Sequence, residues 1–165
     1  MWFYDVEYLQ RHIARNVLES FPYFSNYIAL TRLESAVIFA NLDTPLKHIA
    51  FIGSGPLSLT SLCYAQQLPS VQIHNIDHDG DAIRISSSLA CSLECANRLT
   101  FSCESATSST SLENFDVVYL AALVGSSSEE KLAVLQKVVD RMRHGALVCI
   151  RSAHSLRGLM YPVSF

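Results

Sequence analysis

The architecture of this chain is set by residues 48–61, which read His48-Ile-Ala-Phe-Ile-Gly-Ser-Gly-Pro-Leu-Ser-Leu-Thr-Ser61. An apolar run stops at Gly53-Ser-Gly-Pro56, and apolar residues at helical spacing follow at once. This order predicts a strand, a tight turn and a helix that begins near Leu57. The two glycines lack a Cβ, so the backbone can turn sharply and approach a ligand closely. The first N–H groups of the helix would point at that ligand, so the stretch predicts a site for a nucleotide-like molecule.

Beyond the turn, apolar runs alternate with helical patterns. Three of the apolar runs are almost continuous, which is typical of strands covered on both faces by helices. The sequence therefore predicts an α/β fold with a Rossmann-like, doubly wound, mainly parallel sheet. Ligands of such sheets lie beyond the carboxyl ends of the strands, next to the first strand. The expected strands are 48–52, 71–76, 99–103, 117–123 and 146–150, and the expected helices are 57–67, 81–96 and 128–142.

The first 44 residues carry helical patterns and no strand. One helix is expected over 6–20, and a second begins with Ser25 or Asn26 as its N-cap. The apolar stripe of the second helix consists of Tyr27, Leu30, Leu33, Val37 and Ile38. We therefore expect an N-terminal helical segment, 1–44, and a ligand-binding domain, 45–165. The predicted sheet stops at five strands, so we expect it to lack C-terminal strands.

Composition limits the classes of function. Half of the 165 residues are hydrophobic and only 16% are charged, which excludes a disordered chain. A net charge of -3 gives no electrostatic footprint for nucleic acid. No apolar run reaches the roughly 18–20 residues of a membrane span, and the N-terminus lacks a signal-peptide pattern.

The five cysteines are odd in number and fall in predicted strands and helices, so we interpret them as reduced core residues of a cytoplasmic protein. Cys91 and Cys95 lie one helical turn apart, and we expect them to pack on one helix face rather than bind a metal, because no second ligand pair follows. The cysteines are Cys63, Cys91, Cys95, Cys103 and Cys149.

Asp77 lies just past the second predicted strand, 24 residues after Gly53. A carboxylate at this position can accept hydrogen bonds from both ribose hydroxyls. The spacing favours this role over simple capping of the helix that follows. The neighbouring His74, His78, Asp79 and Asp81 leave the strand on alternating faces, so we do not expect them to converge on a metal.

The turn also lacks the third glycine of a dinucleotide fingerprint, since Ser58 stands at that position. This difference argues against a nicotinamide or flavin dinucleotide. A single nucleoside such as S-adenosylmethionine needs no pyrophosphate cradle and stays compatible with the turn. The acids around such a site would favour its cationic sulfonium.

Glu34 shares the apolar stripe of the second helix, four residues from both Leu30 and Ile38. A carboxylate on a buried face is costly without a partner, and burial favours its protonated form, which would make it a useful proton acceptor. The alternative is a glutamate at the edge of the stripe, paired with an arginine such as Arg32 or Arg84. Periodicity alone leaves both interpretations open.

Two further groups follow strands at the expected ligand edge. Arg151 comes directly after the fifth strand, where it could hold a substrate carboxylate or anchor the loop. His154 follows it three residues later. Tyr119 and the small residues around Ala121 end the fourth strand, where they would either wall the pocket or pack in the core.

Several long strings of this chain resemble the nicotianamine synthase family. The resemblance runs through most of residues 21–163 in the family's order and spacing, and it departs from the plant pattern at Cys103-Glu-Ser105, where plant members read Thr-Thr-Asp. The strings are Phe21-Pro-Tyr-Phe-Ser-Asn-Tyr27, Leu33-Glu34, Ile49–Ser61, His74-Asn-Ile-Asp77, Asp116–Gly125, Gly145-Ala-Leu147, Arg151-Ser-Ala-His154 and Tyr161-Pro162.

The resemblance implies an S-adenosylmethionine-dependent transferase with a methyltransferase-type sheet. Members transfer the 3-amino-3-carboxypropyl group: an amine attacks Cγ next to the sulfonium, methylthioadenosine leaves, and repetition yields nicotianamine, a metal chelator. No metal is implied in catalysis. The catalytic residues carried over are Glu34, Tyr23 and Tyr27, and the residues that would bind S-adenosylmethionine are Gly53, Ser54, Gly55, Pro56, Asp77, Glu104, Ala121 and Arg151.

Alternative functions follow from the same residues. One is a small-molecule methyltransferase that uses S-adenosylmethionine, and another is an inactive, truncated paralogue, because plant relatives continue beyond the Tyr-Pro motif. The expected partner is a small-molecule substrate rather than nucleic acid or a membrane. An uncovered sheet edge would favour pairing with a second chain, so a homo-oligomer is also expected.

Overall fold

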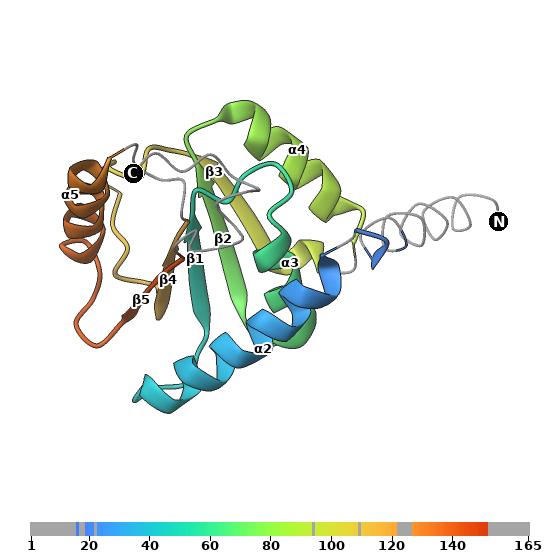
Figure 1. Cartoon of the computed structure of the whole chain (residues 1–165), viewed down its shortest axis with the longest axis horizontal. Coiled ribbons are helices and arrows are strands. Elements are labelled where there is room, and N and C mark those ends of the chain that lie inside the picture. Colours follow the sequence, from blue (N-terminus) through green and yellow to red (C-terminus); the bar gives the residue numbers. More distant parts are fainter. Residues whose placement is uncertain are drawn as a thin grey trace.

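The computed structural model describes residues 16, 19–21, 23–93, 95–108, 110–121 and 127–151 (Figure 1). Its five strands form one sheet of order β3-β2-β1-β4-β5, and every pairing between neighbours is parallel. The predicted Rossmann-like, parallel α/β fold is confirmed. The strands are β1 (His48–Ile52), β2 (Gln72–Asp77), β3 (Leu99–Cys103), β4 (Val117–Leu120) and β5 (Leu147–Ile150).

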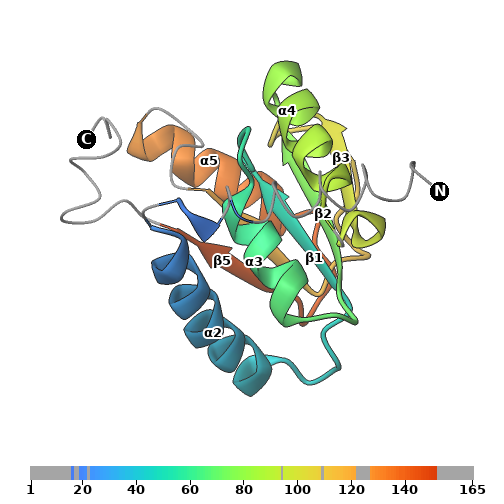
Figure 2. The ribbon, with the colours of Figure 1, turned by 90° about the vertical axis from the view of Figure 1, so that its right-hand side faces the viewer.

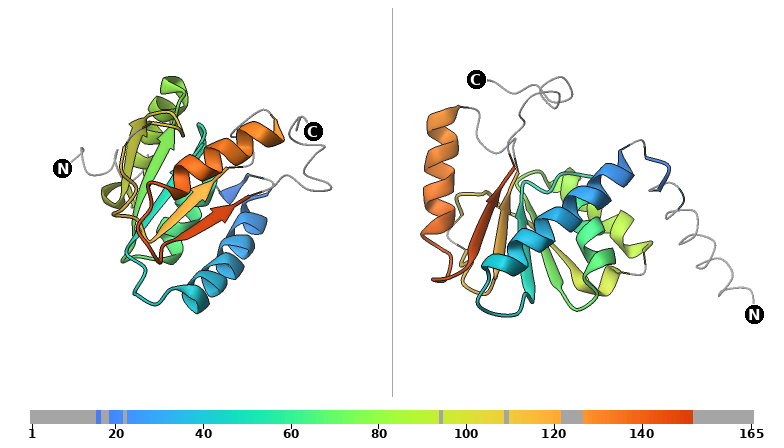
Figure 3. Two further views of the ribbon diagram at one scale, coloured as in Figure 1. Left: turned by 90° about the vertical axis from the view of Figure 1, so that its left-hand side faces the viewer. Right: turned by 60° about the horizontal axis from the view of Figure 1, so that its bottom comes forward.

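The helices form two layers around the sheet. One face is covered by three helices, and α5 covers the opposite face (Figures 2 and 3). None of these helices combines the length and hydropathy that a membrane crossing requires within the described part of the chain. The helices are α2 (Phe24–Asn41), α3 (Leu59–Gln67), α4 (Gly80–Cys91) and α5 (Ser128–Val139), with a short 3-10 helix at Ala96–Arg98.

Each face of the sheet has its own apolar core, because side chains alternate along the strands. Ile49 and Phe51 of β1 pack towards α2 and α3, whereas Ala50 and Ile52 pack towards α5. Val117 and Val118 of β4 are both completely buried, one on each side. The nearly continuous apolar runs in the sequence are therefore explained by helices on both faces.

Helix α2 turns a different face inward from the one expected. Leu33 and Val37 of the predicted apolar stripe are 69% and 63% exposed, while Thr31 and Ser35 are buried. The buried hydroxyls donate to carbonyls of their own helix, Thr31 to Tyr27 and Ser35 to Thr31, so burying them leaves no unpaired group. Apolar periodicity could not detect this face because two of its members are polar.

Several helix boundaries differ from the predictions, and α5 ends at Val139 instead of at residue 142. Helix α2 begins at Phe24 without a side-chain cap, instead of at a Ser25 or Asn26 cap. Helix α3 begins at Leu59, two residues late, because Ser58 adopts a left-handed conformation. Helix α4 ends at Cys91, so Cys91 and Cys95 do not share one helix. The helix expected over 6–20 lies almost entirely outside the described residues, as does the end of the strand expected over 117–123.

Asp116 joins the starts of β1 and β4 to Arg143, in the segment before β5. Its Oδ2 accepts the N–H groups of Lys47 and His48 at 2.7 and 2.8 Å, and its Oδ1 accepts Nη2 of Arg143 at 2.7 Å. Burial favours the neutral acid, but these donors outweigh it, so the pKa of Asp116 lies below its usual value of 3.8. The ionised carboxylate therefore stabilises the start of β1 and β4.

We predict that Asp116→Asn lowers the free energy of unfolding by about 2 kcal/mol at pH 7, because a buried charged acceptor is lost. A carboxyl group whose pKa is lower in the folded protein than in the unfolded chain stabilises the fold at pH values above the unfolded pKa. This stabilisation is lost as the pH falls through the pKa of the folded state. Urea denaturation between pH 7 and pH 2 should therefore show the difference between the two proteins shrinking below about pH 4. A difference that is constant over this range would contradict the assignment.

Candidate active site

The turn after β1 is fixed to the end of β2. Gly53 and Gly55 have φ values of 77° and 67°, the left-handed region that glycine adopts without strain. The N–H groups of Gly53 and Ser54 both donate to the carbonyl of Ile76, at 2.8 and 3.2 Å. The Gly55 N–H donates to Oδ2 of Asp77 at 2.8 Å. The turn is thus held in shape by β2, at the carboxyl edge where ligands of such sheets bind.

Ser58 occupies the place of the third glycine in a dinucleotide fingerprint. It is left-handed, with φ 39° and ψ 40°, and directly precedes α3. A serine in this region costs roughly 1 kcal/mol or more. Its Oγ and that of Ser54 are buried and have no hydrogen-bond partner within the described residues. The position therefore keeps the conformation that glycine favours, although its side chain differs.

A cleft of about 430 Å³ opens at this edge of the sheet. Ser54 and Arg151, which were also predicted to bind the ligand, are not in its wall. Six of the predicted ligand-binding residues line it, namely Gly53, Gly55, Pro56, Asp77, Glu104 and Ala121. Its other walls come from α4, α5 and the segment after β3.

Asp77 is the last residue of β2 and is only 7% exposed. Besides Gly55, its carboxylate accepts the N–H of Asp79 at 3.0 Å. The alternative role of Asp77, that of capping the next helix, is filled by Asp79. The Asp79 side chain accepts the N–H of Asp81 at the start of α4. Asp77 thus has a fixed orientation in the wall of the cleft and keeps lone pairs for a ligand hydroxyl.

Glu104 follows β3 on the same edge. Its Oε2 accepts hydrogen bonds from the hydroxyls of Thr110 and Ser108. The bond from Thr110 is the main reason why the pKa of Glu104 lies below its usual value. The carboxylate therefore organises its own loop while it lines the cleft.

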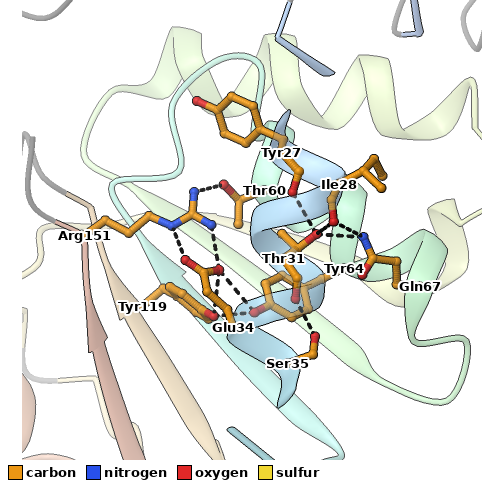
Figure 4. A network of polar contacts seen from close by, with 10 residues as sticks. All are labelled: Tyr27, Ile28, Thr31, Glu34, Ser35, Thr60, Tyr64, Gln67, Tyr119 and Arg151. Atoms are coloured by element: carbon orange, nitrogen blue, oxygen red, sulfur yellow. Dashed lines mark hydrogen bonds and ion pairs between the residues drawn. The ribbon is translucent and has the colours of Figure 1, made fainter. Parts of the chain in front are cut away.

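Glu34 lies at the centre of a polar cluster between α2, α3, β4 and the end of β5 (Figure 4). Its Oε1 accepts Nε of Arg151 at 3.1 Å and its Oε2 accepts Nη2 at 2.7 Å, which makes the ion pair bidentate. The Tyr64 and Tyr119 hydroxyls both lie within hydrogen-bond distance of Oε2, at 3.3 and 3.2 Å. They also bond each other, so one hydroxyl donates to the other and the second proton is left for Oε2. The partner of Glu34 is therefore Arg151, and not Arg32 or Arg84 as the paired alternative suggested.

Arg151 completes the cluster from the other side. Its Nη1 donates to the hydroxyl of Thr60 in the first turn of α3 at 2.6 Å. Its guanidinium lies over the rings of Tyr27 and Tyr119, 6.0 and 5.7 Å from their centroids. Tyr27 is thus near Glu34. Tyr23 is 43% exposed, and its carbonyl accepts the N–H of Tyr27 at 3.1 Å, while its ring contacts Phe21.

Tyr64 and Tyr119 are the residues that sequence reasoning missed or left undecided. Both rings are almost fully buried, and the two hydroxyls share a short hydrogen bond. Burial, reinforced by Glu34, raises the pKa of both phenols, so both remain neutral donors. Tyr64 lies on α3 and gave no sequence signal, because a tyrosine on an apolar helix face is usually a core residue.

The cysteines divide into two groups. Cys63 and Cys95 are buried and Cys149 is half-buried, and burial raises the pKa of the Cys63 thiol to about 12. Cys91 and Cys103 are exposed, so the expectation that all five lie in the core was wrong. Among the described residues, no three His, Cys, Asp or Glu side chains are grouped so that they could hold a metal ion.

We predict that Tyr64→Phe and Tyr119→Phe each lower the free energy of unfolding by about 1 kcal/mol, because each variant removes the buried hydrogen bond between the two hydroxyls. The double variant should depart from additivity by about 0.5 kcal/mol or more, since the hydroxyls contact each other and Glu34. Urea denaturation of the four proteins measures this coupling. Tyr23→Phe, at an exposed ring, is the control, and strictly additive losses would contradict the shared network.

Comparison with known proteins gives the family. The model of the family described as "Nicotianamine synthase protein" matches residues 9–164. The chain is 44% identical to nicotianamine synthase of Solanum lycopersicum over 149 residues, covering 88% of this chain and 47% of that protein. It is 42% identical to nicotianamine synthase 3 of Oryza sativa subsp. indica, covering 88% and 44%. The chain spans about half the length of the curated relatives that it matches.

Solved structures confirm the fold. A mutant of MtNAS in complex with S-adenosylmethionine matches with a TM-score of 0.70 at 17% identity, over 98% of this chain and 61% of that one. The plantazolicin methyltransferase BpumL, in complex with a pentazolic desmethylPZN analog and SAH, matches with a TM-score of 0.61 at 17% identity, over 85% of this chain and 51% of that one. Taken with the sequence relatives, these similarities confirm the resemblance: this chain belongs to the nicotianamine synthase family.

Proposed function

We propose that this chain acts as a nicotianamine synthase-like transferase, which joins 3-amino-3-carboxypropyl groups from S-adenosylmethionine and releases methylthioadenosine. One observation carries the proposal. A carboxylate from the N-terminal helix, Glu34, meets an arginine at the carboxyl end of β5, on the same sheet edge as the glycine turn and its cleft. A nucleoside site and a candidate base therefore lie along one edge.

S-adenosylmethionine is the ligand we assign to the cleft. Its volume of about 430 Å³ lies in the range of sites for small molecules. A Cβ placed at Gly55 would meet no atom within 4 Å, so the backbone is open to a ligand there. Asp77 would accept the ribose hydroxyls with its remaining lone pairs. A complex of MtNAS with this molecule supports the assignment.

The order of the strands gives the ligand a direction. Asp77 ends β2 and Glu104 follows β3, so the nucleoside would extend from the turn towards these two strands. Its reacting carbon would then face the opposite direction, towards β4 and β5, where Ala121 and Arg151 follow the strands. Glu34 is held at that end by Arg151.

Glu34 would act as the proton acceptor. When an amine attacks Cγ, the new C–N bond forms, the C–S bond breaks with its electron pair on sulfur, and the amine must lose a proton. Oε2 already accepts from Arg151 and from one hydroxyl of the Tyr64–Tyr119 pair, whereas Oε1 accepts only from Arg151 among the described residues. Oε1 is therefore the oxygen that would take the proton.

Other features remain proposals from the sequence. Tyr27 would support Arg151 through its ring, as their contact suggests. Four further expectations stay predictions: a contribution of Tyr23 to catalysis, a catalytic reaction without metal, a cytoplasmic location and a homo-oligomeric state.

We predict that purified protein incubated with S-adenosylmethionine alone produces methylthioadenosine and a product with the mass of nicotianamine, both measured by mass spectrometry. Glu34→Gln should reduce turnover by about a hundredfold or more, because a general base contributes that much, while it still binds S-adenosylmethionine. S-adenosylhomocysteine as the by-product would instead indicate a methyltransferase. Unchanged turnover in Glu34→Gln would refute the base assignment.

We predict that Gly55→Ala and Gly145→Ala lower the free energy of unfolding equally, by about 1–2 kcal/mol each. Both glycines have positive φ, 67° and 83°, and at both a Cβ would meet no atom within 4 Å. Only Gly55 lines the cleft, so only Gly55→Ala should weaken S-adenosylmethionine binding in calorimetry. Equal binding by the two variants would exclude the turn from the ligand site.

A further inference from the structure

One wall of the cleft is made by an irregular segment rather than by a helix or strand. Ser105, Ala106 and Thr107 follow β3 and line the cleft directly. Within the segment, the Ser108 N–H donates to the carbonyl of Ser105 at 2.9 Å and the Thr107 N–H donates to the Ser105 hydroxyl at 3.2 Å. The carbonyl of Ala106 needs a donor from elsewhere. Two charged side chains add further bonds to the segment and its flanks, and one of them, that of Arg141, does not line the cleft.

Arg141, just after α5, does not line the cleft but donates hydrogen bonds to this segment. Its Nη2 donates to the carbonyl of Ala106 at 2.5 Å, and its Nη1 donates to the carbonyl of Thr110 at 3.1 Å and reaches the hydroxyl of Ser108 at 3.4 Å. Its Nε donates to the carbonyl of Lys137 at 2.9 Å, which fixes the guanidinium on the end of α5. A planar guanidinium can serve these acceptors at once, which an ammonium group cannot.

Glu104 holds the same wall from the other side. Its carboxylate accepts the hydroxyls of Ser108 and Thr110, the two residues that Arg141 also contacts. Ser108 is therefore shared between a cation and an anion. The segment 105–107 thus lies between Glu104 and Ser108, and its Ala106 carbonyl is bonded to Arg141.

We propose that Arg141 is a positioning residue for the nucleoside half of the ligand: by fixing segment 105–108 from behind, it sets the wall against which the nucleoside packs. The inference rests on the proposed function, because it assumes S-adenosylmethionine in this cleft. The wall adjoins β3 and Glu104, on the side of the turn away from Glu34 and Arg151. Arg141 therefore acts on binding of the nucleoside and leaves the transfer step unchanged.

The backbone near Arg141 has a separate structural role. Its carbonyl accepts the N–H of Leu112 at 3.1 Å, and Leu112 pairs with Met142 in an isolated bridge. Both contacts are made by the main chain, so they persist when the side chain is changed. Side-chain variants at position 141 thus test the wall and not the attachment of the loop.

The test compares Arg141→Met, Arg141→Lys and the unaltered protein in calorimetric titrations with S-adenosylmethionine and with methylthioadenosine. Arg141→Met should raise the Kd for both ligands by about tenfold, because both contain the nucleoside. Arg141→Lys should recover part of this loss. In turnover assays KM for S-adenosylmethionine should rise while kcat changes by less than about twofold, the pattern of lost uniform binding.

Arg98→Met is the matched control. Arg98 also donates to two carbonyls, those of Leu68 and Ala65, at 3.1 and 2.6 Å. It precedes β3 at the amino edge of the sheet, away from the cleft. Its loss should lower the melting temperature and leave both Kd values unchanged.

The outcomes separate the two proposals. Failure of the unaltered protein to bind either ligand overturns the proposed function and this inference with it. If the unaltered protein binds the ligands and both Arg141 variants bind them with the same Kd, only the inference is overturned. A fall in kcat with no change in Kd has the same consequence. Should the variants not fold, hydrogen exchange on the unaltered protein decides: methylthioadenosine must slow exchange of amides 105–108, and unaltered exchange there refutes the wall.

Discussion

A carboxylate withdrawn from water is the constraint around which this site is arranged. The side chain of Glu34 is only 21% exposed, and a charge in that position needs a partner and donors for its lone pairs. Arg151 supplies the charge, and the bonded pair of Tyr64 and Tyr119 supplies a further donor. These four groups come from α2, α3, β4 and the end of β5, so satisfying one carboxylate fixes the relative positions of four elements.

The glycine turn is likewise fixed by a few hydrogen bonds. Asp77 is bonded to the Gly55 amide, and the carbonyl next to it in β2, that of Ile76, receives the Gly53 and Ser54 amides. The turn is therefore shaped by its neighbour in the sheet and needs no ligand to hold it. A site that is already formed loses less conformational entropy on binding.

Much of the fold could be predicted from the sequence, because the parallel sheet depends on a repeated local signal. Apolar runs of four to six residues separated by helical patterns specify β1 to β5. The inward face of α2 could not be predicted this way. Thr31 and Ser35 are buried there through bonds to their own helix, while Leu33 and Val37 face outward. A hydrophobic pattern cannot identify a buried hydroxyl that donates its hydrogen bond to its own helix.

The candidate site was predictable where it follows strand ends and not where it depends on side-chain pairing. Gly53, Gly55 and Asp77 follow β1 and end β2, so sheet topology alone brings them to one cleft. The pairing of Glu34 with Arg151 joins residues that no local pattern connects. Periodicity therefore left open whether Glu34 had a partner, and it named different arginines.

The separation between these two residues has a consequence for how the protein is made. Glu34 and Arg151 are 117 positions apart, and Arg151 follows the edge strand β5. Closing a loop of that length costs entropy that is recovered only when the intervening strands have paired. During synthesis the carboxylate emerges long before its arginine, and it stays hydrated until the sheet is assembled. The ion pair is therefore expected to form late in folding, after the strands between the two residues have paired.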